Sequence, residues 1–388
     1  MRFGHSRDGK RGKPIVVYGV LTDVQGRPVA VEVYPGNTGD PSTVADQVEK
    51  LKRRFGLERV VLVGDRGMLT QTQIEVLKAH PGIGWISALR SEKARQLVDE
   101  KHLQLSLFDE RNLAEIRSPD FPGERLVACF NPLLAEERRR KRNALLDATE
   151  LLLEKIRLQV QRRTKTPLSA AQIGQKVGKV INRHKVGKHF EVSIADGHCS
   201  FSRRTAAIKR EAELDGLYVI RTSEPRQTLS AHDTVRSYKN LAQVERAFRT
   251  LKGADLRIRP IHHRGEERVR AHIFLCLLAY DVEWHMRQAL SPLLFDDETL
   301  PSERKRRDPV APAEPSASAR RKKTERQTED GFPIHSFATL MAQLGTRCRH
   351  LCRLKSDADS PAFFQHTLPT PLQARALELI RLFPVPGS

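Results

Sequence analysis

Two acidic residues and their surroundings are the strongest candidates for chemistry in this sequence. Asp65 follows the apolar run Arg59–Val63 and begins a glycine-rich turn. Ligands and metals gather at the carboxyl ends of strands in α/β sheets, so Asp65 is a candidate metal ligand. The local sequence is equally typical of an aspartate that only caps the next turn.

The second candidate is Glu245, in the segment Tyr238–Lys252. On a helix of 3.6 residues per turn, this carboxylate shares one stripe with Tyr238, Arg249 and Lys252. A carboxylate flanked by cations suits a metal site whose neighbouring cations hold phosphates. The alternative is a surface ion pair between Glu245 and Arg249, which is worth only about 0.2–0.5 kcal/mol.

The composition indicates a polyanionic partner. The 388 residues include 67 Lys+Arg and 47 Asp+Glu, a formal net charge of +20. Such a charge favours nucleic acids, because lysine and arginine release counterions from phosphates. The longest apolar stretch, Ile273–Leu278, is too short to span a bilayer, which excludes membrane classes. Five scattered cysteines are typical of a protein in the reducing cytoplasm.

The elements that must position these residues begin with two β-branched runs, Pro14–Leu21 and Val29–Tyr34, which predict an antiparallel hairpin. A helix with Asp40 as its N-cap follows. Arg59–Val63 and Trp85–Leu89 are further strands, separated by a helix over about 70–80. The order β-β-α-β-α-β predicts a mixed sheet covered by helices, an α/β fold.

The remainder of the chain has a different character. Pro132–Gln161 predicts a long charged helix whose run Arg138–Arg142 is a solvated or phosphate-facing patch. Two more helices are predicted over 234–254 and 268–289, the second with a core face of Ile273, Phe274, Leu277 and Leu278. Residues 301–331 contain nine Lys/Arg, six Asp/Glu, four Pro and no aromatic residue, which predicts disorder.

Five motifs stand in an order that resembles the DDE transposases of the insertion-sequence-four group. The resemblance runs from about Gly4 to Arg287. It implies an RNase H-like mixed sheet interrupted by an α+β insertion, and an enzyme that cleaves insertion-sequence ends and transfers the strands. The motifs are GNTGDPST, VVLVGDRGM, YKNLAQVERAFRTLK, RPIHHR and VRAHIFLCLLAY.

The resemblance also implies roles for individual residues. Asp65 and Glu245 match the family's second catalytic aspartate and its catalytic glutamate, and both would bind metal in a two-Mg²⁺ site. Lys252 matches a phosphate-contacting lysine, and Tyr238 matches the motif's tyrosine. Leu241 stands where the wider group has an arginine, which weakens any prediction of a phosphate contact there.

Double-stranded DNA, both transposon ends and target, is the expected partner, bound by a homodimer with no role for a membrane. The adjacent His262 and His263 lack a carboxylate at metal-ligand spacing, so the loop is assigned to DNA. The residues expected to contact DNA are Tyr238, Arg249, Lys252, His263, Arg264, Lys10 and Arg11.

The family's first catalytic aspartate belongs to a strand that precedes the Gly4–Lys13 motif, and the chain begins at Met1. Asp8 lies in a Gly/Lys-rich loop and is a poor substitute. We therefore expect an N-terminally truncated chain with its first strand missing, an incomplete metal site and weak or no activity.

The alternatives are a non-catalytic DNA-binding remnant that inhibits an intact transposase, and an RNase H-like host nuclease. The predicted organisation is a catalytic domain over 1–90 and 233–298, an insertion lobe over 91–232, a disordered basic linker over 299–333, and a short helical tail over 334–388.

Overall fold

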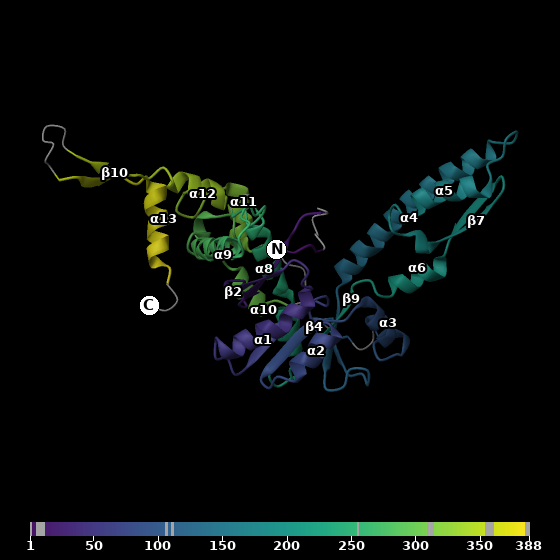
Figure 1. The fold of residues 1–388 in the computed structure, drawn as a ribbon, viewed down its shortest axis with the longest axis horizontal. Helices are drawn as coiled ribbons and strands as arrows, with labels where there is room; N and C mark the ends of the chain where they lie inside the picture. The colour runs from purple at the N-terminus through teal and green to yellow at the C-terminus, as the bar shows by residue number, and fades with distance from the viewer. Residues whose placement is uncertain are drawn as a thin grey trace. The chain divides into compact units, whose positions relative to one another are not determined.

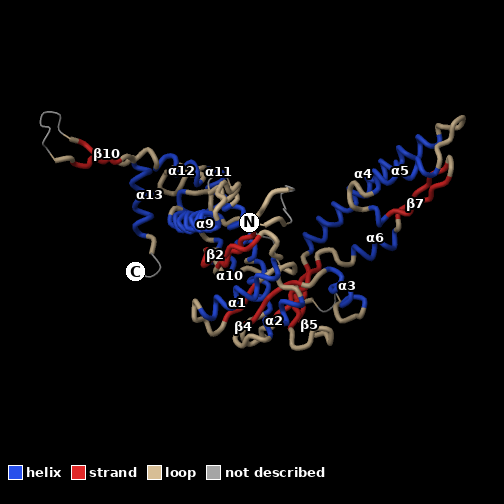
Figure 2. Tube along the Cα trace, viewed as in Figure 1, coloured by secondary structure: helices blue, strands red, loops and turns tan. Residues whose placement is uncertain are grey.

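A computed structural model describes residues 2–4, 12–104, 108–109, 112–253, 256–308, 310, 314–353 and 361–384. The chain divides into two compact units. Many of their helices and strands are labelled along the ribbon in Figure 1, and Figure 2 distinguishes helices, strands and loops by colour. Unit 1 comprises Met1–Gln47, Lys239–Pro309 and Ala313–Ser388, and unit 2 comprises Val48–Tyr238 and Val310–Pro312.

Unit 1 begins with the predicted hairpin, which is confirmed. Strands β1 (Val16–Thr22) and β2 (Pro28–Pro35) pair antiparallel and form a two-stranded sheet of their own. One apolar face of this hairpin packs on helices α8 (Leu241–Leu251) and α9 (Glu266–Ala289). The shared core of hairpin and helices includes Val16, Tyr18, Val20, Val31, Val33, Ala247, Leu251, Val269, Ile273, Leu277 and Tyr280.

The predicted apolar face of α9 is only half right. Ile273 and Leu277 are buried, whereas Phe274 and Leu278 are 56% and 49% exposed. The segment is apolar on several sides, so periodicity alone did not indicate which side would face the hairpin.

The helix after β2 begins one residue earlier than predicted. Gly39, in extended conformation, is the N-cap of a short 3₁₀ helix (Asp40–Thr43), so Asp40 is the first helical residue. The Ser42 hydroxyl donates to the Gly39 carbonyl at 2.7 Å. Helix α1 (Val44–Arg53) then continues, and Gly56 lies beyond its end with a φ of 63°.

Unit 2 is built on a five-stranded mixed sheet, which confirms the predicted α/β class at this level. The strand order is β3-β4-β9-β6-β5, with β3 and β4 parallel and the other neighbours antiparallel. Three of its strands come from the range 91–232 that the sequence assigns to an insertion lobe. The strands are β3 (Val60–Val63), β4 (Ile83–Ala88), β5 (Leu113–Ile116), β6 (Arg125–Phe130) and β9 (Leu217–Thr222).

Neither β1 nor β2 belongs to this sheet, and β1 and β3 do not pair in the described part of the chain. Strand β3 is therefore an edge strand whose residues are half-buried, not the buried strand that the apolar run predicts. The parallel pair β3–β4 is connected through helix α2 (Gln71–Lys78), as such a crossover requires.

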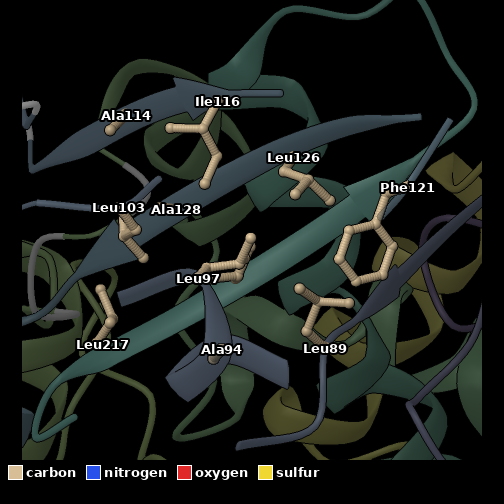
Figure 3. Close-up of a cluster of buried hydrophobic side chains, with 11 residues drawn as sticks. Leu89, Ala94, Leu97, Leu103, Ala114, Ile116, Phe121, Leu126, Ala128 and Leu217 are labelled. Atoms are coloured by element: carbon tan, nitrogen blue, oxygen red, sulfur yellow. The ribbon is translucent and has the colours of Figure 1, made fainter. Parts of the chain in front are cut away.

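Successive side chains of a strand point to opposite faces of the sheet, and both faces of this sheet are covered by helices. On one face, Leu126 and Ala128 of β6 pack with Leu97 of α3 (Ser91–Asp99), in the cluster of Figure 3. On the other face, Val127 and Cys129 pack with Val235 of α7 (Ala231–Lys239).

The rest of unit 2 is an α+β segment that we term the arm. It has its own core, in which Leu146 and Leu153 of α4 meet Ile173 and Val177 of α5. A capping box, formed by Ser169 and Gln172, starts α5. Its elements, shown in Figure 1, are α4 (Pro132–Gln161), α5 (Ala170–Ile181), a 3₁₀ turn (Gly187–His189), the β7 (Phe190–Ala195)–β8 (His198–Arg203) hairpin and α6 (Thr205–Ala212).

The sequence predicts a disordered linker over 299–333, whereas the structure shows helices α10 (Leu300–Arg306) and α11 (Ala317–Glu325) there. Lys322 of α11 is buried, and its Nζ donates to the Ser291 carbonyl at 2.8 Å and bonds Glu298. These contacts join residues far apart in the sequence, which local composition does not reveal.

The C-terminal tail, predicted as helical over 334–388, is helical only in part. Helix α12 (Phe337–Leu344) and helix α13 (Pro371–Leu382) pack against Leu290 and Leu293. Leu290 precedes a 3₁₀ turn (Ser291–Leu293), and Leu293 is its last residue. Between them, β10 (Arg349–Cys352) and β11 (Phe363–His366) form an antiparallel pair.

Candidate active site

Asp65 stands directly after β3, where the sequence places it, and its side chain is exposed. Its Oδ1 accepts from the backbone amides of Gly67 at 2.8 Å and Met68 at 2.7 Å. The predicted turn-capping role is therefore real. It does not exclude a ligand role, because Oδ2 has no hydrogen-bond partner among the described residues.

The glycines around Asp65 shape this turn. A Cβ on Gly64 would lie 2.7 Å from Cγ of the buried Leu69, and one on Gly67 would lie 3.2 Å from Oδ1 of Asp65. Larger residues would push the carboxylate away from its two amide donors. The turn thus holds one oxygen of Asp65 in place and leaves the other facing solvent.

Glu245 lies on α8 in unit 1, and its side chain is exposed. The ion pair with Arg249, weighed as the alternative, is not formed, and no described residue bonds the Glu245 carboxylate. The helix beneath it is fixed by the buried Ala247 and Leu251 and by the Tyr18 and Phe248 rings, whose centroids are 5.7 Å apart. Glu245 is thus a free carboxylate on a firmly packed helix.

The turn of the β1–β2 hairpin helps to place α8. Gly26 has a φ of 80°, and a Cβ there would lie 2.6 Å from Cβ of Gln243. The hairpin can approach α8 this closely only because residue 26 has no side chain. Tyr280 of α9 donates to the Gly26 carbonyl at 3.4 Å. Hairpin, α8 and α9 therefore support one another beside Glu245.

Two predicted phosphate-binding cations also lie on α8 or at its end. Arg249 and Lys252 are exposed, and neither forms an ion pair with a described residue. The Lys252 Nζ lies 5.5 Å from the centroid of the Phe248 ring. Unit 1 therefore groups one free carboxylate with two free cations on a single helix.

The other predicted DNA contacts are placed differently. The helix predicted over 234–254 is divided at Asn240, so Tyr238 belongs to α7 and unit 2, where it packs partly buried against the sheet. His263 and Arg264 are exposed in the loop before α9, and the His263 ring lies 5.7 Å from that of His272. Lys10 and Arg11 lie outside the described residues.

The donor chemistry of the two carboxylates fits a hard divalent cation such as Mg²⁺, which prefers oxygen ligands. Asp65 offers Oδ2, and Glu245 offers both carboxylate oxygens. Within the described ranges, no group of three or more His, Cys, Asp or Glu side chains is gathered as a metal site. Each candidate is therefore an available single ligand, one in each unit.

One family model decides the affiliation. The transposase DDE domain matches residues 2–282. The chain belongs to this family of transposases. No curated protein and no solved structure matches the sequence.

In this transposase, the matched residues contain both carboxylates, the cations of α8 and the whole arm. The family acts in DNA transposition, and its members are generally catalytic and use divalent metals. Among the described helices, none is long and apolar enough to cross a membrane.

One group of residues in this transposase lies outside all five sequence motifs. The segment 162–188 of the arm contains eight Lys/Arg and no Asp/Glu. That imbalance was visible in the sequence, but only the structure shows that these side chains belong to one folded element with its own core.

Proposed function

We propose that this chain is a transposase of the insertion-sequence-four group that cleaves insertion-sequence ends and transfers the DNA strands with the help of Mg²⁺. The observation that carries the proposal is the family match over residues 2–282, which includes Asp65 and Glu245. The order of the five sequence motifs supports the assignment to the group.

Asp65 and Glu245 are the proposed metal-binding carboxylates. When bound, two Mg²⁺ ions activate the attacking oxygen and stabilise the leaving oxygen in phosphoryl transfer. Asp65 would contribute Oδ2 while its Oδ1 stays bonded to the amides of Gly67 and Met68. Glu245 needs no ion pair broken before it binds a metal. Both ligands are thus ready at little cost in reorganisation.

The cations near Glu245 would hold the DNA. Arg249, Lys252 and Arg264 are exposed without acidic partners in the described chain, so they are free to pair with phosphates. His263, Tyr238, Lys10 and Arg11 complete the proposed surface. The partner is double-stranded DNA in the cytoplasm, with one copy of a homodimer at each transposon end.

The proposed catalytic domain is RNase H-like and combines residues 1–90 with 233–298, interrupted by the insertion 91–232. Strands β5, β6 and β9 of this insertion extend the β3–β4 sheet. Residues 299–333 and 334–388 follow as a linker and a tail.

Metal binding tests the two ligands directly. We expect the full chain to bind Mn²⁺, used as a spectroscopic probe for Mg²⁺, and Asp65→Asn and Glu245→Gln each to weaken that binding by more than about tenfold. Groups that only hydrogen-bond a metal ligand are worth roughly 10- to 100-fold, so a ligand itself should matter at least as much. Glu267→Gln, an exposed acid on α9, is the matched control. Equal affinities in all four proteins would refute the proposed ligands.

Cleavage tests the reaction. We expect nicking and strand joining of DNA that carries the element's ends in Mg²⁺ but not in EDTA, with both activities lost in Glu245→Gln and retained in Glu267→Gln. Nicking without joining would instead support the host nuclease. DNA binding with no Mn²⁺ site would support the non-catalytic remnant. The sequence predicts weak or no activity for this chain, so strong Mg²⁺-dependent cleavage would contradict that prediction while supporting the proposed reaction.

A further inference from the structure

The arm carries a run of cations without any acids. Residues 162–188 contain eight Lys/Arg and no Asp/Glu, while the whole chain has 67 against 47. Seven of the eight are exposed, and Lys176 is half-buried. The eight are Arg162, Arg163, Lys165, Lys176, Lys179, Arg183, Lys185 and Lys188.

Three acids of α4, the helix before the run, pair with arginines outside it, and Asp196 accepts a hydrogen bond from the backbone amide of Ala170 at 2.6 Å. Asp147 and Glu150 of α4 both pair with Arg203 of β8, and Glu154 pairs with Arg157. Of the eight cations, only Lys188 has an acidic partner in the described chain, which is Glu211. The other seven cations therefore form no ion pair with a described residue.

The cations are held on a rigid base. Arg162 and Arg163 follow the C-terminal end of α4 and, with Lys155, line a surface hollow that contains no acid. Lys176 and Lys179 lie on α5, and Arg183 and Lys185 follow its end. Since α5 has 12 residues, the charges extend over about 18 Å, at a rise of 1.5 Å per residue. Duplex DNA presents one phosphate per roughly 1.7 Å of axis, so a stretch of this length offers several.

We propose that the arm, through residues 155–188, is a second DNA-binding surface of this transposase, made of other residues than the cations of α8, and that it holds the phosphate backbone of duplex DNA. This inference rests on the proposed function, because a transposase must hold long DNA while it acts on the ends. Residues 155–188 include no Phe, Tyr or Trp, so they offer no platform for stacking unpaired bases. Backbone contacts to a duplex, independent of base sequence, are what such a surface supports.

The test compares two variants with the same loss of charge. The arm variant carries R163Q, K165Q, K179Q and R183Q, all exposed. The control carries R54Q, R117Q, R320Q and K323Q, which are also exposed and have no acidic partner among the described residues. Affinity of the full chain for a duplex of about 30 base pairs is measured over a range of salt in EDTA.

We expect the arm variant to reduce the slope of log K against log salt by about two to four, because each lost phosphate contact contributes about one. Its duplex affinity should fall more than about tenfold, with less than one unit of slope lost in the control. Thermal melting equal to that of the parent shows that the arm is still folded. Equal changes in the two variants, or tighter binding of single strands through the arm, would overturn the proposal.

The proposed function and the DNA-binding role of the arm are tested by different measurements. The proposed function would be refuted by unchanged Mn²⁺ binding in Asp65→Asn and Glu245→Gln, a measurement that needs no DNA. Binding of DNA in EDTA needs no metal site, so the arm is tested whether or not the carboxylates bind metal.

Discussion

The surface of α8 and the surface of the arm both present cations that no acid neutralises, yet they differ in one respect. On α8, Arg249 and Lys252 accompany the free carboxylate of Glu245. In the arm, Asp147, Glu150 and Glu154 of α4 are paired with arginines, and the segment 162–188 contains no acid.

This difference separates phosphate binding from metal binding, which net positive charge alone does not distinguish. Cations attract phosphates wherever they are, but a metal ion needs carboxylate oxygens that are not already bonded to an arginine. The α8 surface offers both kinds of group, and the segment 162–188 of the arm offers only the first. We therefore expect chemistry and affinity to respond to different mutations.

The largest expected effect is at Glu245. Glu245→Gln should reduce Mg²⁺-dependent cleavage by about 100- to 1000-fold, since a lost metal ligand removes several kcal/mol of transition-state stabilisation. Its affinity for duplex DNA in EDTA should stay within about twofold of the parent, because the cations are unchanged. A parallel loss of cleavage and affinity would contradict the separation of tasks.

The next effect concerns the packing that supports α8. Gly26→Ala should lower the free energy of unfolding by about 2–4 kcal/mol, because the new Cβ meets Gln243 and the residue must keep a positive φ. Gly123→Ala is the matched control, since its φ of 73° is similar and nothing lies within 4 Å of its Cβ. It should cost about 1 kcal/mol, from backbone strain alone.

Chemical denaturation measures both glycine variants. If the two cost the same, the close approach of the hairpin to α8 would not contribute to stability, and the placement of Glu245 would depend on the α8–α9 core alone.

A smaller effect is expected from the cations of α8. Lys252→Gln and Arg249→Gln should each reduce the salt slope of DNA binding by about one. Fluorescence anisotropy with a labelled duplex detects such a change. Because the α8 and arm cations share no partner in the described chain, we expect their slope losses to add. A combined variant that loses no more slope than the arm variant would show that α8 does not contact phosphates.

The smallest effect concerns the arm's interior. Burial lowers the pKa of His189, an effect that the nearby Glu211 carboxylate opposes. The unfolded chain therefore binds a proton more readily than the folded arm. The contribution of the neutral His189 to the free energy of unfolding is therefore complete above about pH 6.5 and decreases as the pH falls below that value.

Melting curves at about pH 7.5 and pH 5.5 should accordingly show a larger loss of stability in the parent than in His189→Gln. The same loss in both proteins would mean that other groups carry the acid sensitivity of the arm.

Much of the local structure was predictable from the sequence. The β-branched runs around Gly26 predicted the hairpin, and the apolar run Arg59–Val63 located β3 to within one residue. Asp65 and Glu245 were likewise identified from residue type and position, and the match over residues 2–282 supports the family to which they were assigned. The metal-binding roles themselves stay predictions until the variants are measured.

Other features depended on contacts between distant residues. Composition predicted disorder over 301–331, but α11 is anchored there because Lys322 donates to the carbonyls of Ser291 and Asp296. The core face of α9 was half wrong, since Phe274 and Leu278 face outward while Ile273 and Leu277 meet the hairpin. Neither the anchoring of α11 nor the buried face of α9 can be predicted from the spacing of residues within a single segment.

The sequence by itself determined the charge imbalance, the strand and helix periods and the identity of the two carboxylates, because these depend on residue type and local spacing. The tertiary structure decided which strands share a sheet, since β5, β6 and β9 join β3 and β4 through backbone hydrogen bonds that have no residue signature. It also decided which charges are free. A charged side chain can bind a ligand only when the packing of distant residues leaves it without an ion-pair partner, as for Glu245. In the arm, Asp147 and Glu150 pair with Arg203, so these two acids do not pair with the cations of the segment 162–188.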